Sequence, residues 1–237
     1  MLFFYVRHGD PIYNPDSLTE LGKKQAEALA KRLALYGIDK IYASTSPRAI
    51  MTAQPTCDLL KKDMTLLDFC NEGQVWRRFT IERDGRRTWL YQDVQSVHTF
   101  LDKSVRSLGF SWYEHPEFKE FDYKKGVDWI NTETDNFFLS LGYEHDRERG
   151  KYKVVQKNDE RIALFAHEGF FKAFMSSLLN MPYPEFASRF EVCHSGLTVI
   201  DFQEYNGYAV PKILTMSSDS HLYREGIMTG YNNGIRF

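Results

Sequence analysis

Two kinds of hydrophobic pattern alternate along the first third of the chain. Residues 2–6 form a short apolar run that charge and glycine end abruptly, which predicts a buried strand. Over residues 20–36 the apolar positions recur at helical spacing, with Thr19 as a suitable N-cap and Gly37 as the stop. This stretch therefore predicts a strand followed, after a polar loop, by an amphipathic helix.

The same alternation continues on both sides of a less regular middle segment. Ser46 is expected to cap a second helix that runs to about residue 62, with Pro47 in its first turn and Pro55 as the position of a kink. The remaining expected elements are strands over residues 38–43, 64–69, 161–166, 197–202 and 211–216 and a helix over 170–179.

The middle segment, residues 73–160, is rich in Trp, Tyr, Phe and charge, and its periodicity is broken. Its clearest helical piece covers residues 133–141. The order β-α-β-α-β, insertion, β-α-β-β predicts an α/β fold, a three-layer α/β/α sandwich with a mostly parallel central sheet. We expect one domain, residues 1–237, with the middle segment as a mixed insertion over the active site that sets specificity.

The composition of the chain argues against several classes of function. The formal net charge is −2, from 30 basic and 32 acidic residues, which gives no reason to expect nucleic-acid or membrane binding. The three cysteines are odd in number and widely spaced, so we expect reduced thiols in a cytoplasmic protein. No cluster has metal-ligand spacing and no Walker-type glycine loop is present, so we expect no metal and no cofactor.

Three polar clusters follow three of the predicted strands. They are Arg7-His8-Gly9, Ser46-Pro47-Arg48 and His167-Glu168-Gly169. Ligands of open α/β sheets bind at the carboxyl ends of the strands, so these clusters are expected to meet at one edge. Arginine matches the oxygens of a phosphoryl group with a planar, permanently charged fork, and a neutral imidazole can attack phosphorus. A backbone carbonyl of the loop could hold the other ring nitrogen and fix the tautomer.

These clusters also carry a family resemblance. The chain resembles the histidine phosphatase superfamily, in its phosphoglycerate-mutase-like branch. The segments that carry the resemblance are residues 4–9 (Phe-Tyr-Val-Arg-His-Gly), 18–22 (Leu-Thr-Glu-Leu-Gly), 43–49 (Ala-Ser-Thr-Ser-Pro-Arg-Ala), 52–53 (Thr-Ala), 166–169 (Ala-His-Glu-Gly) and 195–198 (Ser-Gly-Leu-Thr). The similarity covers roughly residues 1–72 and 160–220.

The resemblance implies roles for individual residues. His8 would be the phosphorylated nucleophile, and a clamp of three side chains would hold the phosphoryl oxygens: Arg7, Arg48 and His167. Asn14 and Glu168 stand as further substrate-binding candidates. A carboxyl group after the third strand would protonate the leaving oxygen and then activate water.

The identity of that carboxyl group stays open. Glu72 is the first choice and Asp68, a few residues earlier, is the rival. Asp10 stands where the branch frequently carries a glutamate or glutamine, and we do not give it the acid role. His194 and His221 lie near the same edge in sequence order and are candidates for supporting groups.

Three functions remain in view at this point. The first is a phosphatase that hydrolyses a small phosphorylated metabolite through a phosphohistidine, with a homodimer as a possible assembly. The second is a phosphoglycerate mutase, and the third is a non-catalytic module that binds a phosphorylated ligand. The arginines and aromatic residues near the start of the insertion, from Trp76 to Tyr91, fit either a lid over a large anionic substrate or a solvated surface segment.

Overall fold

The computed structural model describes residues 1–236 and divides the chain into two compact units. The first unit comprises Met1–Asn71, Lys157–Glu168 and Val192–Phe237, and the second comprises Glu72–Gln156 and Gly169–Glu191. The expected insertion, residues 73–160, nearly coincides with the first segment of the second unit. Residues 169–191, which we assigned to the α/β core, group with that segment instead. The single-domain organisation and the specificity role of the insertion stay predictions.

The first unit is built on a mixed sheet. Its elements are β1 (Leu2–Arg7), β2 (Pro11–Tyr13), β3 (Asp16–Leu18), α1 (Glu20–Tyr36), β4 (Lys40–Ser44), α2 (Pro47–Leu60), β5 (Met64–Leu67), β10 (Arg161–Ala166), β11 (Leu197–Tyr205), β12 (Tyr208–Ser218) and α9 (Ser220–Arg224). Within this unit the strand order is β5-β4-β10-β1-β11-β12. Strands β2 and β3 form a separate hairpin where the sequence predicted only a polar loop.

Strand direction in this sheet determines where the polar clusters lie. β1 pairs in parallel with β10, β10 with β4, and β4 with β5, whereas β11 runs antiparallel to β1 and to β12. The register sets Arg7 opposite Ala166, so His8 and His167 follow at the same edge. The sequence-based expectation that these two clusters share one edge is therefore met.

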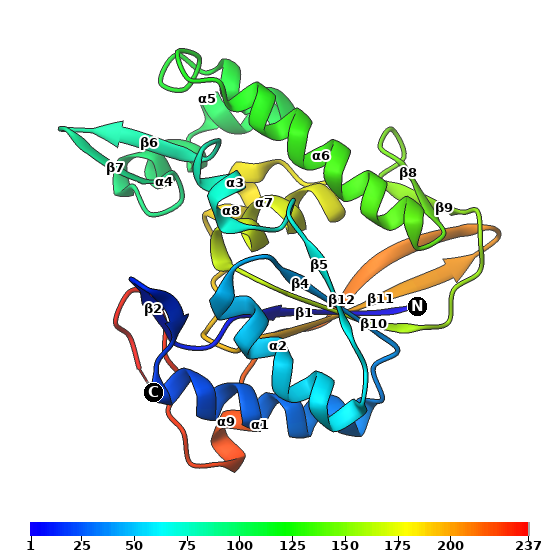
Figure 1. Ribbon diagram of the computed structural model, residues 1–237. Coiled ribbons are helices and arrows are strands. Elements are labelled where there is room, and N and C mark those ends of the chain that lie inside the picture. The colour runs from blue at the N-terminus through cyan, green and yellow to red at the C-terminus, as the bar shows by residue number, and fades with distance from the viewer. Residues whose placement is uncertain (237) are drawn as a thin grey trace. The chain divides into compact units, whose positions relative to one another are not determined.

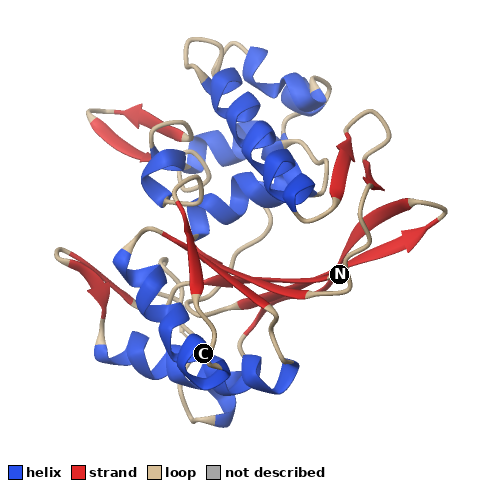
Figure 2. Cartoon of the chain, turned by 45° about the vertical axis from the view of Figure 1, so that its right-hand side comes forward, coloured by secondary structure: helices blue, strands red, loops and turns tan. Residues whose placement is uncertain are grey.

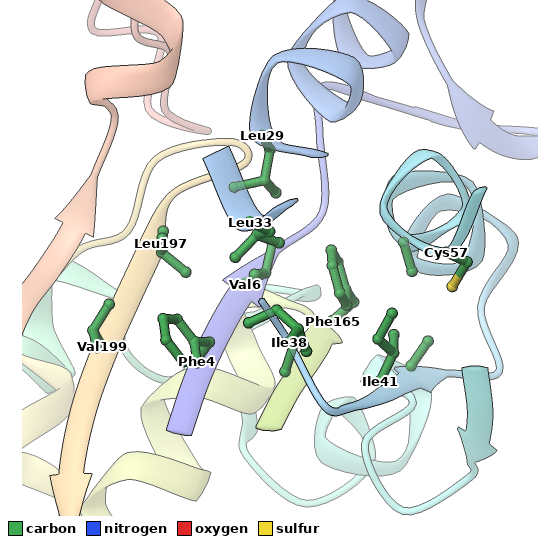
Figure 3. Close-up of a cluster of buried hydrophobic side chains, with 13 residues drawn as sticks. Phe4, Val6, Leu29, Leu33, Ile38, Ile41, Cys57, Phe165, Leu197 and Val199 are labelled. Atoms are coloured by element: carbon green, nitrogen blue, oxygen red, sulfur yellow. The ribbon is translucent and has the colours of Figure 1, made fainter. Parts of the chain in front are cut away.

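A continuous apolar core joins the sheet to two helices. Figure 1 shows α1, α2 and α9 together on one face of the strands of the first unit. Figure 3 shows the core between them, with Phe4 and Val6 of β1 facing Leu29 and Leu33 of α1. Burial of such side chains contributes about 1.5–3 kcal/mol each, which is the main source of stability for this layer.

Local chemistry explains the bounds of α1. The Thr19 side chain accepts a hydrogen bond from the Gly22 amide, and Gly37 ends the helix at a φ of 71° while its amide donates to the Leu33 carbonyl. Both caps were predicted. Ser46 is the N-cap residue of α2 and Pro47 begins the helix, as predicted, but the Ser46 hydroxyl makes no cap hydrogen bond and donates to Asp16 at 2.6 Å instead.

The second unit is mostly helical, as Figure 2 shows by colour. Its elements are α3 (Glu72–Trp76), β6 (Thr80–Arg83), β7 (Arg86–Trp89), α4 (Val94–Leu101), α5 (Lys103–Arg106), the 3-10 helix η1 (Gly109–Glu114), α6 (Tyr123–Ser140), β8 (Tyr143–Asp146), β9 (Lys151–Val154), α7 (Glu168–Leu178) and α8 (Tyr183–Ala187). Glu168, the first residue of α7, is assigned to the first unit. The expected helix over residues 133–141 is the second half of α6, which begins ten residues earlier.

The first half of α6 lacks an apolar stripe because part of its buried face is not hydrophobic. In this half, Gly126 lies on the buried face of α6 together with Tyr123 and Ile130. A Cβ atom at position 126 would lie 3.1 Å from the Cβ atom of Arg78, so Gly126 lets α6 approach Arg78 closely. Hydrophobic periodicity alone therefore misses this half of the helix.

The predicted fold class is confirmed. The structure is α/β, with a large central mixed sheet flanked by helices. In residues 1–236 no helix has the length and apolar character needed to cross a bilayer. The three cysteines, Cys57, Cys70 and Cys193, are buried and form no disulfide.

Candidate active site

His8 lies one residue beyond β1, on a loop held by the neighbouring strand. Its amide donates to the Ala166 carbonyl at 2.9 Å. Its Nδ1 lies 2.7 Å from the Gly9 carbonyl oxygen, which can only accept, so Nδ1 carries the proton and Nε2 keeps its lone pair. Burial is the largest cause that lowers the pKa of His8 well below 6.5, followed by the nearby His167, Arg7 and Arg48. The ring is therefore neutral near pH 7, with Nε2 available as a nucleophile.

Arg7 is the fully buried last residue of β1. Its Nη1 lies 3.0 Å from Oε2 of Glu168, which is also buried, and it donates to the Val192 carbonyl. This ion pair compensates a charge that would otherwise be costly inside the protein. The Glu168 carboxylate is thus engaged with Arg7, and its expected part in substrate binding stays a prediction.

Arg48 stands in the first turn of α2 and is oriented by a side chain from the β2–β3 hairpin. Its Nη1 lies 2.9 Å from Oδ1 of Asp16, whose Oδ2 accepts from Ser46. Thr52, one turn later, donates to the Arg48 carbonyl at 2.7 Å and accepts from the Gly9 amide at 3.0 Å. These hydrogen bonds of Thr52 connect the start of α2 to the loop that carries His8.

His167 follows β10 and is fully buried. Its Nε2 lies 2.8 Å from the Ser44 hydroxyl at the end of β4, and its carbonyl accepts from the Tyr5 hydroxyl. Burial, then Arg48 and Arg7, lower the pKa of His167 well below 6.5. The rings of His8 and His167 lie 5.2 Å apart, centroid to centroid. Two neutral imidazoles and two guanidinium groups are thus brought to one edge of the sheet, a donor set that suits a phosphoryl group.

A second chain of polar groups adjoins His8, and it joins His194, a candidate supporting group in the sequence analysis, to Asn232, which the sequence analysis did not name. The ring of His194 stacks near His8 at 6.1 Å, its Nε2 contacts Asn232 at 2.9 Å, and Asn232 donates to Glu168 at 3.2 Å. Asp10 Oδ1 lies 3.3 Å from His194 Nδ1. Burial and then Arg7 lower the pKa of His194 to about 4. His194 was singled out from its place in sequence order near the catalytic edge, whereas no sequence signal pointed to Asn232.

Three further candidates from the sequence analysis lie on other elements. Asn14 is exposed in the turn of the β2–β3 hairpin. Asp68 is exposed after β5 and accepts a hydrogen bond from Thr45 at 3.3 Å. Glu72 opens α3 in the second unit, where its Oε1 accepts from the Gly169 amide at 3.1 Å. The roles expected for these residues stay predictions.

Known proteins share both the sequence motifs and the fold. The model of the histidine phosphatase superfamily (branch 1) matches residues 3–94. No curated protein sequence matches the chain. A phosphoserine phosphatase from Entamoeba histolytica, solved with 3-phosphoglyceric acid, is similar in structure with a TM-score of 0.59 and 19% identity, over 93% of this chain and 98% of that one.

A second similar structure is a mycobacterial glucosyl-3-phosphoglycerate phosphatase solved with VO3. Its TM-score is 0.58 and its identity 17%, over 90% of this chain and 97% of that one. At such identities the likeness shows the fold. The resemblance that the motifs suggested is confirmed: residues 3–94 match the histidine phosphatase superfamily, branch 1, and the chain has the α/β fold of that superfamily.

Proposed function

We propose that this protein is a phosphatase that hydrolyses a small-molecule phosphate monoester through a phosphohistidine on His8. The observation that carries the proposal is the state of His8: its Nδ1–H is held by the Gly9 carbonyl and its pKa is lowered, so Nε2 is a free nucleophile near pH 7. The two similar structures are phosphatases, one solved with 3-phosphoglyceric acid and one named for glucosyl-3-phosphoglycerate, which supports a small phosphorylated metabolite as substrate.

In the first half-reaction the lone pair of His8 Nε2 forms a bond to phosphorus while the bond from phosphorus to the ester oxygen breaks. Arg7, Arg48 and His167 bind the phosphoryl oxygens, on which negative charge is spread in the transition state. The leaving oxygen takes a proton from a carboxylic acid and departs as an alcohol.

In the second half-reaction water attacks phosphorus and the P–N bond breaks, which returns neutral His8 and releases inorganic phosphate. The same carboxyl group, now ionised, accepts the proton from the attacking water. One carboxyl group thereby serves as acid and then as base, and the enzyme ends in its starting protonation state.

Glu72 is the carboxyl group that we propose for this role, with Asp68 as the rival. Glu72 Oε1 is hydrogen-bonded to the amide of Gly169, which follows His167 by two residues along the chain. The Asp68 carboxylate is exposed and bonded to Thr45. The test compares Glu72→Gln with Asp68→Asn: we expect a loss of kcat of about 10²-fold or more only in the former. Loss only in Asp68→Asn would overturn the assignment.

The first test of the proposed function measures whether the protein releases phosphate from p-nitrophenyl phosphate. His8→Ala should abolish the release, whereas His98→Ala, which removes an exposed histidine of α4, should leave it unchanged. Interconversion of phosphoglycerates without net phosphate release would indicate a mutase instead. Phosphate binding without any phosphoenzyme would indicate a binding module.

A further inference from the structure

A surface pocket lies between α1 and α9 in the first unit, away from the polar groups described above. Its volume is about 490 Å³. The two helices that form it are in contact and lie side by side in Figure 1. This volume falls in the range of pockets that hold small organic molecules.

The pocket carries an excess of positive charge. Three cations and one acid line it: Lys31, Arg32, Arg224 and Glu225. Lys31 pairs with Glu225 at 2.9 Å. Among the residues that the structure describes, Arg32 donates to neutral oxygens only, the hydroxyls of Tyr36 and Ser218. Arg224 is exposed and has no acidic partner within residues 1–236. Two guanidinium groups therefore remain for an anionic ligand, and arginine suits carboxylate and phosphate groups equally.

Part of the pocket wall is apolar. Leu35 lines the pocket with 76% of its surface exposed, and the ring of Tyr36 lies beside it. The guanidinium carbon of Arg32 lies 5.7 Å from the centre of that ring. A ligand with an apolar or aromatic body next to its anionic group would cover the exposed leucine and gain hydrophobic free energy.

His221 also lines the pocket. Its side chain is buried, and its Nδ1 has no hydrogen-bond partner within residues 1–236. An unsatisfied buried polar atom costs about 1–3 kcal/mol, so a ligand group that reached Nδ1 would relieve this cost. The other ring nitrogen, Nε2, lies 2.9 Å from the Ser195 hydroxyl.

Ser195 connects His221 of the pocket to the loop that carries His8. Its amide donates to the His8 carbonyl at 3.0 Å. Two consecutive hydrogen bonds thus lead from His221 to the main chain of His8. A shift of α9 that moved His221 would act on Ser195 first and on His8 next.

We propose that the pocket between α1 and α9 is a regulatory site for a small organic anion, a carboxylate or phosphonate-like group on an apolar body. His221 and Ser195 act as positioning residues: a ligand bound in this pocket shifts His221 and Ser195, and this shift changes the position of His8. Binding at the pocket is independent of any catalytic role for His8, whereas an effect on turnover rests on the proposed function.

The first test is direct binding to the whole chain by isothermal titration calorimetry, with benzoate as the carboxylate probe and phenylphosphonate as the phosphoryl-like probe. Arg224→Gln should weaken binding about tenfold, because a charge-assisted bond is lost. Lys24→Gln, which removes an exposed cation of α1 outside the pocket, should leave the Kd unchanged. Absence of saturable binding at millimolar concentrations, or equal binding to both variants, would overturn the site. Preference for one probe identifies the anionic group.

The second test follows the His8 Cε1–H signal by NMR, assigned from its loss in His8→Ala. Saturating benzoate should shift this signal in the wild type, and Ser195→Ala or His221→Gln should bind benzoate yet abolish the shift. A signal that does not move, or that moves equally in Ser195→Ala and His221→Gln, would overturn the connection. The kcat for p-nitrophenyl phosphate with and without benzoate completes the test. A chain that binds benzoate at this pocket but hydrolyses no ester would refute the proposed function and leave the site intact.

Discussion

The buried ion pair between Arg7 and Glu168 gives the sharpest energetic prediction. The Arg7 side chain is 0% exposed and the Glu168 side chain 3%, and the charged atoms lie 3.0 Å apart. Glu168→Gln keeps the shape of the side chain but leaves the guanidinium charge without its partner inside the protein. Breaking such a pair costs about 3 kcal/mol of the free energy of unfolding, or roughly 6–12 °C in Tm for a chain of this size.

Urea denaturation of the wild type and Glu168→Gln at neutral pH measures this loss. The matched control is Glu20→Gln, which removes an acid from a solvent-exposed pair with Lys23 and should be indistinguishable from the wild type. Inorganic phosphate should stabilise Glu168→Gln more than the wild type, because the bound anion supplies the missing negative charge near Arg7. A loss in Glu168→Gln no larger than in the control would refute the role of Glu168 as the counter-ion of Arg7.

Three further predictions concern the packing and titration of the first unit. Gly22→Ala should destabilise the chain by about 1–3 kcal/mol in urea denaturation, since a Cβ there would stand 2.2 Å from the Asp10 carbonyl oxygen; an unchanged midpoint would contradict the contact. Thr52→Val should lower the free energy of unfolding by about 1–3 kcal/mol and reduce kcat, because the buried Gly9 amide loses its acceptor. Wild-type stability and activity in this variant would refute the role of this hydrogen bond. The pKa values of four buried histidines, His221 among them, are lowered below the ordinary 6.5, so the unfolded chain binds protons that the folded chain does not. The free energy of unfolding should therefore fall as the pH drops from about 6.5 toward 4, by ~1.4 kcal/mol per pH unit for each histidine. His221→Asn should remove one of these contributions. An unchanged dependence of the free energy of unfolding on pH in this variant would show that His221 does not contribute.

The positions of the groups at the candidate active site could be predicted because local sequence patterns mark the strands that these groups follow. Short apolar runs that end in polar residues marked β1, β4 and β10, and parallel pairing brings the residues that follow them to one edge. Neither hydrophobic periodicity nor motif spacing could supply the partners that orient these groups. Asp16 reaches Arg48 from a hairpin, and Asn232 reaches His194 across 38 positions of the sequence.

The second unit was the least predictable part. Its hairpin β6–β7 contains the charged run from Arg83 to Arg87, and the first half of α6 buries a face that includes Gly126. Tertiary packing rather than local propensity determines such elements. The position of Glu72, at the start of α3, depends on the same packing, and the sequence alone leaves its role as the acid open against Asp68.

The central claim is that His8 becomes phosphorylated during turnover. Rapid acid-free quenching of the wild type with radiolabelled p-nitrophenyl phosphate, followed by peptide mapping, tests this directly. We predict a base-stable, acid-labile label on the peptide that contains His8, absent from His8→Ala and present in His98→Ala. Turnover without any such label, or a label that survives acid, would contradict the account.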